Sequence, residues 1–175
     1  MTDTAEVLGQ GRFLRLVKRG GWEFVERTKV SGIVGMVAVT PDDELLLVEH
    51  FNIPFGKPSI ELPAGLAGDA DAREGEPLSA AAFRELLEET GYEAAELSYL
   101  ATATTSSGLC TEEVSLYRAL GMKRIGPGGG VDGENITVRR IPLREVHDWL
   151  AQRHRAGCVV DMKIYAALSF AQASR

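Results

Sequence analysis

The chain has 175 residues and a net charge of −6, with 45% hydrophobic and 25% charged residues. This length and composition are typical of one globular domain with a sizeable core. The negative charge argues against a nucleic-acid polymer or an anionic membrane as the main partner. The polar, acidic start is not a signal peptide, and no apolar run reaches the ~18 residues of a membrane span. We therefore expect a single cytoplasmic domain over residues 1–175.

Apolar and alternating runs predict strands in the first part of the chain. Two short runs flank Gly20-Gly21, which is the signature of a β-hairpin near the N-terminus. The turn-forming Pro41-Asp42-Asp43 separates two further apolar runs, and a third pair ends in the sequence IELPAG. The small, polar residues that follow predict a loop. The predicted strands cover residues 12–19, 22–30, 32–40, 44–50 and the flanks of 51–59, and the loop covers 66–76.

A helix is predicted after this loop. Pro77 suits the first turn of a helix, and Gly91 suits its C-terminal cap. Between them, apolar residues recur at three- and four-residue intervals, as on the buried face of an amphipathic helix. These residues are Leu78, Ala82 and Leu86, with Phe83 and Leu87 widening the stripe.

The second half of the chain contains both strand and helix patterns. Its predicted strands are 97–104, 113–120 and 136–143, and its predicted loops are 105–112 and the flexible, glycine-rich 126–135. Helical periodicity is present in 144–155 and 162–172, with Asp161 as the N-cap of the last helix. The order of strands, helix, strands and helices predicts an α+β sandwich with mixed β-sheets.

The predicted central helix carries an unusual group of acids. Glu85, Glu88 and Glu89 lie at i, i+3 and i+4, so their carboxylates project from one narrow face. A solvated acidic surface is one interpretation, and a face on which a cation normally sits is the other. Two neighbours favour the cation, because Arg84 is placed to pair with Glu88 at i+4 and Glu76 lies at the helix start.

The chemistry of these groups matches a hard divalent cation. Clustered carboxylates, backbone carbonyls and water are the ligands that Mg²⁺ and Mn²⁺ prefer. The sequence ELPAG, at the end of the preceding strand, can bring backbone carbonyls near the helix. Divalent ions held in this way bridge a diphosphate and lower the pKa of a bound water. We therefore expect Mg²⁺ or Mn²⁺ as the cofactor.

The segment EPLSAAAFRELLEETGY, residues 76–92, resembles the Nudix box, G-x5-E-x7-R-E-U-x-E-E-x-G-U with U aliphatic. Tyr92 replaces the last aliphatic residue. Gly65 best matches the leading glycine, which implies a five-residue insertion in the loop 66–75. Further segments resemble the ADP-ribose and nucleotide-sugar pyrophosphatases of this family: WEFVERTK, VEHFNIPFGKPSIELPAG, SSGLCTEEV, GENITVRRIPL and VDMKIYAALSFAQ. The resemblance implies a Nudix-type α/β/α sandwich with an N-terminal β-hairpin.

The resemblance also implies the roles of individual residues. The metal ligands it implies are Glu85, Glu88, Glu89 and the backbone carbonyl of Ala64. Arg84 is expected to orient a glutamate and, with Glu88, to belong to the catalytic set. Glu76 is expected to buttress the helix start.

The general base is expected outside the helix. Glu134 best matches the acid that the family places on a late loop, where a mobile carboxylate can take a proton from the attacking water. The alternative is a solvent-exposed loop acid without a catalytic role. Glu112 is the competing acid and a candidate helper of a further metal.

A substrate-binding set is implied as well: Trp22, Arg27, Asn52, Gly65, Gly108 and Leu109. Trp22 matches a position at which the family stacks the base, and the alternative is an aromatic packed in the core or at a dimer interface. Arg27 is a candidate phosphate contact. The resemblance further implies that the N-terminal strands, residues 1–30, form part of a homodimer.

Two departures from the family pattern bear on the substrate. Asn52 stands where related enzymes have an arginine, and Ser107 stands where a proline is usual. The first expectation is hydrolysis of ADP-ribose to a nucleoside monophosphate and a sugar phosphate, but both departures leave GDP-mannose, a UDP-sugar or a dinucleotide open. A non-catalytic, nucleotide-binding Nudix-like regulator is a rival from another class, although the box acids are all present.

The cysteines and histidines suggest no further metal site. Cys110 and Cys158 lie far apart, and two free thiols in a reducing compartment are favoured over one disulfide. The three histidines, His50, His147 and His154, are too scattered for a zinc site, which favours surface or packing roles.

Overall fold

The computed structural model describes residues 4–68, 75–131 and 133–172. The helices are α1 (Leu78–Thr90), α2 (Val146–Arg155) and α3 (Lys163–Gln172). The strands of the first half are β1 (Glu6–Gln10), β2 (Leu14–Arg19), β3 (Trp22–Arg27), β4 (Gly32–Ala38), β5 (Glu44–Asn52), β6 (Lys57–Glu61) and β7 (Ala64–Ala67). Those of the second half are β8 (Tyr92–Glu93), β9 (Glu96–Thr104), β10 (Glu113–Leu120), β11 (Lys123–Arg124), β12 (Thr137–Pro142) and β13 (Val159–Val160).

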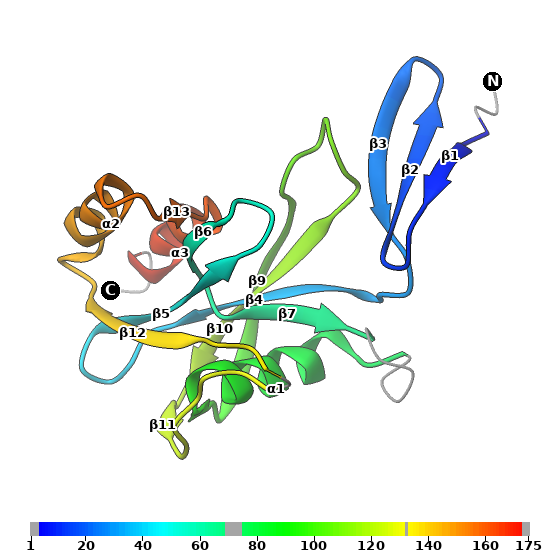
Figure 1. Ribbon diagram of the computed structural model, residues 1–175. Coiled ribbons are helices and arrows are strands. Elements are labelled where there is room, and N and C mark those ends of the chain that lie inside the picture. Colours follow the sequence, from blue (N-terminus) through cyan, green and yellow to red (C-terminus); the bar gives the residue numbers. More distant parts are fainter. Residues whose placement is uncertain (1–3, 69–74, 132, 173–175) are drawn as a thin grey trace.

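The N-terminal strands form a sheet that stands apart from the rest of the fold (Figure 1). Strands β2 and β3 make the predicted hairpin, in which Arg19 pairs with Trp22 across Gly20-Gly21. Strand β1 adds a third antiparallel strand with a register shift between Val7 and Gly9. The prediction of a simple hairpin was therefore incomplete by one strand.

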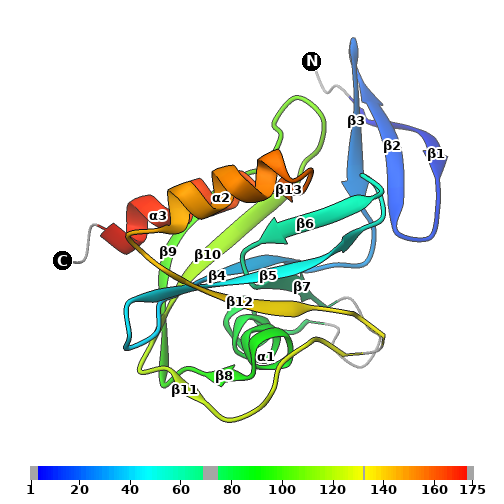
Figure 2. The ribbon, with the colours of Figure 1, turned by 60° about the vertical axis from the view of Figure 1, so that its left-hand side comes forward.

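Two four-stranded sheets form the body of the molecule. One has the order β7-β4-β10-β9, in which β4 and β10 are parallel and the other neighbours are antiparallel. The other has the order β12-β5-β6-β13, with β13 parallel to β6. Helix α1 lies on one side of the sheets, and α2 and α3 lie on the other side (Figure 2). The predicted α+β sandwich with mixed sheets is confirmed.

Two buried clusters hold these layers together. Because successive side chains of a strand point to opposite faces, β4 and β5 each supply both clusters. One cluster includes Leu45 and Leu47 and packs against α2 and α3. The other includes Met36 and Leu46 and packs against α1. Helix α1 is therefore fixed to the sheet through a continuous apolar contact.

Helix α1 begins after Pro77 and ends at Gly91, as predicted, and Gly91 adopts the left-handed conformation of a C-terminal cap. Its buried apolar stripe includes Ala82 and Leu86. Phe83 and Leu87 are 39% and 38% exposed, so the expectation that they widen the stripe was wrong. The face next to the buried stripe carries the acids instead.

Several short elements escaped prediction. Strand β7 occupies the sequence AGLA, where a turn and the start of a loop were predicted, because Ala64 and Leu66 pair with Gly35 and Ile33 of β4. Most of the expected insertion lies outside the described residues.

None of the described helices is long and apolar enough to cross a membrane. The predicted N-cap of α3 is present, since the backbone N–H of Lys163 donates to Asp161 Oδ1 over 2.7 Å.

Candidate active site

Arg84 is the centre of the acidic face of α1. Its guanidinium donates to both carboxylate oxygens of Glu76, at 3.0 and 3.1 Å, and to the carbonyl of Leu66 at 3.1 Å. It also binds Glu85 at 2.7 Å and Glu88 at 3.1 Å. The hydrogen bond to Glu76, followed by the contacts with the other two acids, raises the pKa of Arg84. One cation thus holds three carboxylates, and the predicted pairing with Glu88 is confirmed.

Glu89 lies deeper than its neighbours, with only 8% of the residue exposed. Its Oε2 accepts a hydrogen bond of 3.0 Å from the backbone N–H of Ala64, the first residue of β7. Burial, together with the charges of Glu85, Glu134 and Glu61, raises the pKa of Glu89 to about 9 against the opposing effect of that hydrogen bond. Burial also raises the pKa of Glu85. Both shifts have burial as their largest cause, and neighbouring acids add to each of them.

Gly65 explains how β7 approaches the helix so closely. A Cβ atom at this position would lie 2.0 Å from Cδ of Glu85. Any side chain would therefore displace either the carboxylate or the strand. The glycine lets the backbone of β7 lie directly against the acids.

The glycine-rich loop after β11 is attached to the C-terminal end of α1. The backbone N–H groups of Gly129 and Gly130 donate to the carbonyls of Glu89 and Glu88 over 2.8 and 3.0 Å. These carbonyls belong to the last turn of the helix, where carbonyl groups have no hydrogen-bond partner within the helix. The predicted loop is present, and this part of it caps the acid-bearing helix.

Glu134 follows this attached segment. Its Oε2 accepts a hydrogen bond of 3.1 Å from the backbone N–H of Val131. Glu134 and Glu89 line the same cavity of about 490 Å³, together with Phe51 and Ile53 of the β5–β6 hairpin. The structure thus places Glu134, the predicted base, on one cavity with Glu89, a predicted metal ligand, although the two residues lie 45 positions apart in the sequence.

The donor set of this face fits a divalent cation. Carboxylate oxygens are the hard ligands of Mg²⁺ and Mn²⁺, and the raised pKa of Glu89 marks a carboxyl group that a nearby cation would help to ionise. In the part of the chain that the structure describes, no three acidic, His or Cys side chains converge as a closed metal site. Arg84 binds Glu85 and Glu88, so both carboxylates lie against its guanidinium.

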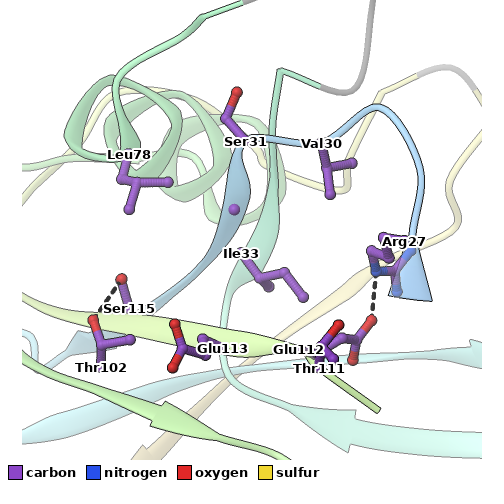
Figure 3. A pocket seen from close by; sticks show the side chains of 11 residues that line it. Arg27, Val30, Ser31, Ile33, Leu78, Thr102, Thr111, Glu112, Glu113 and Ser115 are labelled. Carbon is purple, nitrogen blue, oxygen red and sulfur yellow. Dashed lines mark hydrogen bonds and ion pairs between the residues drawn. The ribbon is translucent and has the colours of Figure 1, made fainter. Parts of the chain in front are cut away.

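Arg27 and Glu112 lie at another pocket. They form an ion pair of 2.5 Å, and they line a polar cavity of about 280 Å³ between the start of β4 and the start of β10 (Figure 3). Leu78, from the start of α1, and the hydrogen-bonded pair Thr102 and Ser115 close this cavity (Figure 3). Among the residues that the structure describes, none lines both this cavity and that of Glu89 and Glu134.

The other residues predicted to bind substrate are dispersed. Trp22 is 69% exposed and is the first residue of β3, in the N-terminal sheet rather than beside the acids of α1. Asn52 shapes the β5–β6 hairpin, since its Oδ1 accepts from the N–H of Phe55 at 3.2 Å and its amide reaches Glu61 at 3.4 Å. Gly108 and Leu109 lie on the loop beside β3, where the carbonyl of Leu109 accepts from the N–H of Val25.

One polar cluster near the acids was missed. His50 Nε2 lies 3.0 Å from Glu61 Oε1 and 3.2 Å from Ser59 Oγ, and Ser59 donates to Glu61 over 2.5 Å. The β5–β6 register places His50 directly opposite Ser59. The sequence placed His50 on the same side of the strand as Val48 and Asn52, but only the strand pairing reveals the cluster.

Comparisons with known proteins agree with this geometry. Residues 31–158 match the model of the NUDIX domain. The chain is 30% identical over 148 residues to the methanol dehydrogenase activator of Bacillus methanolicus, over 84% of this chain and 75% of that protein. It is 31% identical over 151 residues to the ADP-ribose pyrophosphatase of Mycobacterium tuberculosis, over 82% of this chain and 71% of that protein.

A crystal structure described as an ADP compounds hydrolase shares the fold. It superposes with a TM-score of 0.66 at 21% identity, over 85% of this chain and 80% of that chain. The matched domain contains the whole of α1, its acids and the capping loop. The chain therefore belongs to the Nudix hydrolase family, whose members act on pyrophosphate bonds.

Proposed function

We propose that this protein is a Mg²⁺- or Mn²⁺-dependent pyrophosphatase of nucleoside diphosphate sugars, with ADP-ribose as its first candidate substrate. The observation that carries this proposal is the placement of Glu134 and Glu89 on one cavity beside the acidic face of α1. The similarity to a protein named ADP-ribose pyrophosphatase, from Mycobacterium tuberculosis, supports the choice of substrate.

Each residue of the proposed site has a separate role in the hydrolysis. Glu85, Glu88, Glu89 and the carbonyl of Ala64 would hold the cation, and Arg84 orients Glu88 from the side. When bound, the divalent ion offsets the charge of the diphosphate and lowers the pKa of a bound water. Glu134 accepts a proton from the attacking water. Water oxygen bonds to phosphorus as the phosphoanhydride bond breaks, which yields a nucleoside monophosphate and a sugar phosphate.

A different base or sugar is the second candidate. Asn52 uses both ends of its amide within the hairpin, so it offers the substrate no positive charge in place of the family's arginine. The described residues that line the cavity of Glu134 include no Lys or Arg. GDP-mannose, a UDP-sugar or a dinucleotide therefore belongs in the same test as ADP-ribose.

A substrate panel with product analysis tests the proposal. The protein is incubated with each compound and Mg²⁺, and nucleoside monophosphate is quantified by chromatography. We expect one member to be hydrolysed far faster than the others, with AMP as the product if it is ADP-ribose. If no member is hydrolysed with either metal, the protein is better described as a nucleotide-binding regulator.

A homodimer completes this proposal. Apolar side chains of the N-terminal sheet are left exposed in the single chain, which marks an interaction surface. Phe13, Leu14, Leu16 and Trp22 are 62%, 45%, 40% and 69% exposed. We propose that this sheet packs on a second copy and brings Trp22 of one chain to the nucleotide base bound by the other.

A further inference from the structure

The cluster of His50, Ser59 and Glu61 lies next to the proposed catalytic acids and has no part in the proposed chemistry. Its three side chains come from β5 and β6 and meet on one face of that pair. Ser59 is 1% exposed, so its hydroxyl must find its partners inside the protein. The charge of Glu61 contributes to the raised pKa of Glu89, which shows that both groups share one electrostatic environment.

The hydrogen bonds determine where the protons of this cluster lie. Burial opposes ionisation of Glu61, but hydrogen bonds from Ser59 and His50 and the charge of His50 keep its pKa below the ordinary value. An ionised carboxylate only accepts, so the Ser59 hydroxyl donates to it. The His50 Nε2 must then carry a proton as well, because its neighbours at 3.0 and 3.2 Å are this carboxylate and the oxygen of Ser59. These bonds fix the orientation of the ring and leave Nδ1 as its remaining polar atom.

His50 also lines the cavity of Glu89 and Glu134. Among the described residues that line this cavity, it is the only side chain that can carry positive charge. A diphosphate held over the acids would lie within the same cavity. With Glu61 at one nitrogen and a phosphate oxygen at the other, a protonated ring would donate to both anions.

We propose that His50 is a substrate-binding residue whose Nδ1–H donates to a phosphate oxygen, and that Ser59 and Glu61 orient its ring for this contact. The inference rests on the proposed function in requiring a diphosphate in this cavity. It replaces the sequence-based expectation of a surface or packing role for His50. It also provides a donor on the β5–β6 hairpin where Asn52 offers none.

Two substitutions separate substrate binding from a purely structural role. In His50→Gln, the amide nitrogen takes the place of Nε2 and keeps the bond to Glu61, but the Nδ1 donor is lost. In His50→Asn, the amide nitrogen takes the place of Nδ1, and the bond to Glu61 is lost. If His50 binds phosphate, His50→Asn should retain more affinity for Mg-ADP than His50→Gln. If His50 only supports Glu61, His50→Gln should retain more.

Calorimetric titration of the full chain with ADP and Mg²⁺ provides the measurement. We expect the Kd of Mg-ADP to rise about tenfold in His50→Gln and about threefold or less in His50→Asn. Adenosine, which lacks phosphate, should bind equally to both variants and to wild type. His147→Gln, at an exposed histidine on α2, is the matched control and should bind Mg-ADP as wild type does.

The remaining outcomes overturn the inference. They are an unchanged Kd in His50→Gln, a larger loss in His50→Asn than in His50→Gln, an equal loss of adenosine affinity, or no binding of Mg-ADP to wild type. The substrate panel decides the proposed function separately. A His50-dependent affinity for Mg-ADP without hydrolysis of any panel member would retain the binding role and reject the pyrophosphatase.

Discussion

The acids of α1 differ in burial although they lie within five residues of one another. Glu89 is nearly enclosed and contacts the Ala64 N–H, whereas Glu85 and Glu88 contact Arg84. A carboxyl group without a cation partner is costly to ionise in such a place. Glu89 is therefore the acid whose ionisation should depend most strongly on a bound divalent ion.

Glu89→Gln should nearly abolish turnover. The amide oxygen can still accept from the Ala64 N–H, so the fold should be retained while an anionic ligand is lost. Because a metal ion supplies several kcal/mol of charge stabilisation, we expect kcat to fall by about 10³-fold or more, with weaker Mn²⁺ binding in a calorimetric titration. The control is Glu96→Gln, at an exposed acid of β9. Normal turnover by Glu89→Gln would refute the ligand assignment.

Glu134→Gln should separate the base from the metal ligands. Removal of a general base lowers kcat by about 10²–10⁴-fold, and the Val131 N–H keeps an acceptor in the amide oxygen. We expect Mn²⁺ affinity close to that of wild type, measured in the same titration. Loss of metal binding with an unaffected kcat at saturating metal would show that Glu134 is a ligand and that another group is the base.

Glu61 should make the fold sensitive to acid. Its pKa in the folded protein lies below the ordinary value of 4.5, as hydrogen bonds and the charge of His50 outweigh burial. The ionised group therefore stabilises the fold fully above pH 4.5, and this contribution is lost as the pH falls through the folded-state pKa. Urea unfolding between pH 7 and pH 3 should show a smaller loss of stability in Glu61→Gln than in wild type. Parallel curves would contradict the assignment.

Residue pairs within one helix were the predictable part of the site. The Arg84–Glu88 contact follows from helical geometry alone, since residues four apart lie on the same face. The contact of Ser59 with His50 depends on the register between two strands, which the turn at residues 53–56 determines. The contact of Glu89 with Ala64 depends on how close β7 lies to α1. Neither the register of β5 and β6 nor the approach of β7 to α1 can be predicted from a local sequence pattern.

At the scale of elements, the glycine-rich loop connects the two halves of the site. It caps the last carbonyls of α1 and then leads to Glu134. Gly128 lies close against the helix end, with φ +71° and a Cβ position 2.4 Å from the carbonyl carbon of Thr90. The loop therefore transmits the position of the helix to the proposed base.

Gly128→Ala should lower both stability and kcat, whereas Gly133→Ala is its matched control. Both positions have positive φ, but a Cβ at Gly133 has no neighbour within 4 Å. Strain at positive φ costs about 1 kcal/mol in each variant. Only Gly128→Ala must also displace the loop from the helix, so its Tm and its kcat should fall further than those of the control. Equal effects in thermal denaturation and turnover assays would show that loop docking does not position Glu134.

Long elements were predictable from periodicity, and short ones were not. Helix α1 and strand β10 match their predicted bounds, because each has a complete apolar pattern and clear ends. Strands β8, β11 and β13 have two residues each, so they are too short to show any alternation. They exist because neighbouring strands supply partners, which is a property of the whole fold.

At the scale of the molecule, the N-terminal sheet exposes apolar side chains on one side of β2. Leu14 and Leu16 lie two apart on β2 and so point to the same side. If this face packs on a second copy, light scattering should give twice the 18.9 kDa of one chain. Leu16→Glu should shift the protein toward the monomer, because it places a charge in an apolar interface.

Lys18→Gln provides the control for this experiment, since Lys18 is an exposed polar residue on the same side of β2. It should leave the molar mass unchanged. A monomeric wild-type protein at micromolar concentration would contradict the proposed dimer. A dimeric Leu16→Glu protein would place the interface on another surface.

The guanidinium of Arg84 has a consequence for folding in the absence of bound ligands. Because it already neutralises part of the carboxylate array, the polypeptide has an internal substitute for the inorganic ion while it folds. Newly made protein should therefore reach its native fold in a chelated medium, and the proposed divalent ion should bind afterwards. Stripping and reloading should then be reversible, so that the same sample can be compared with one metal after another.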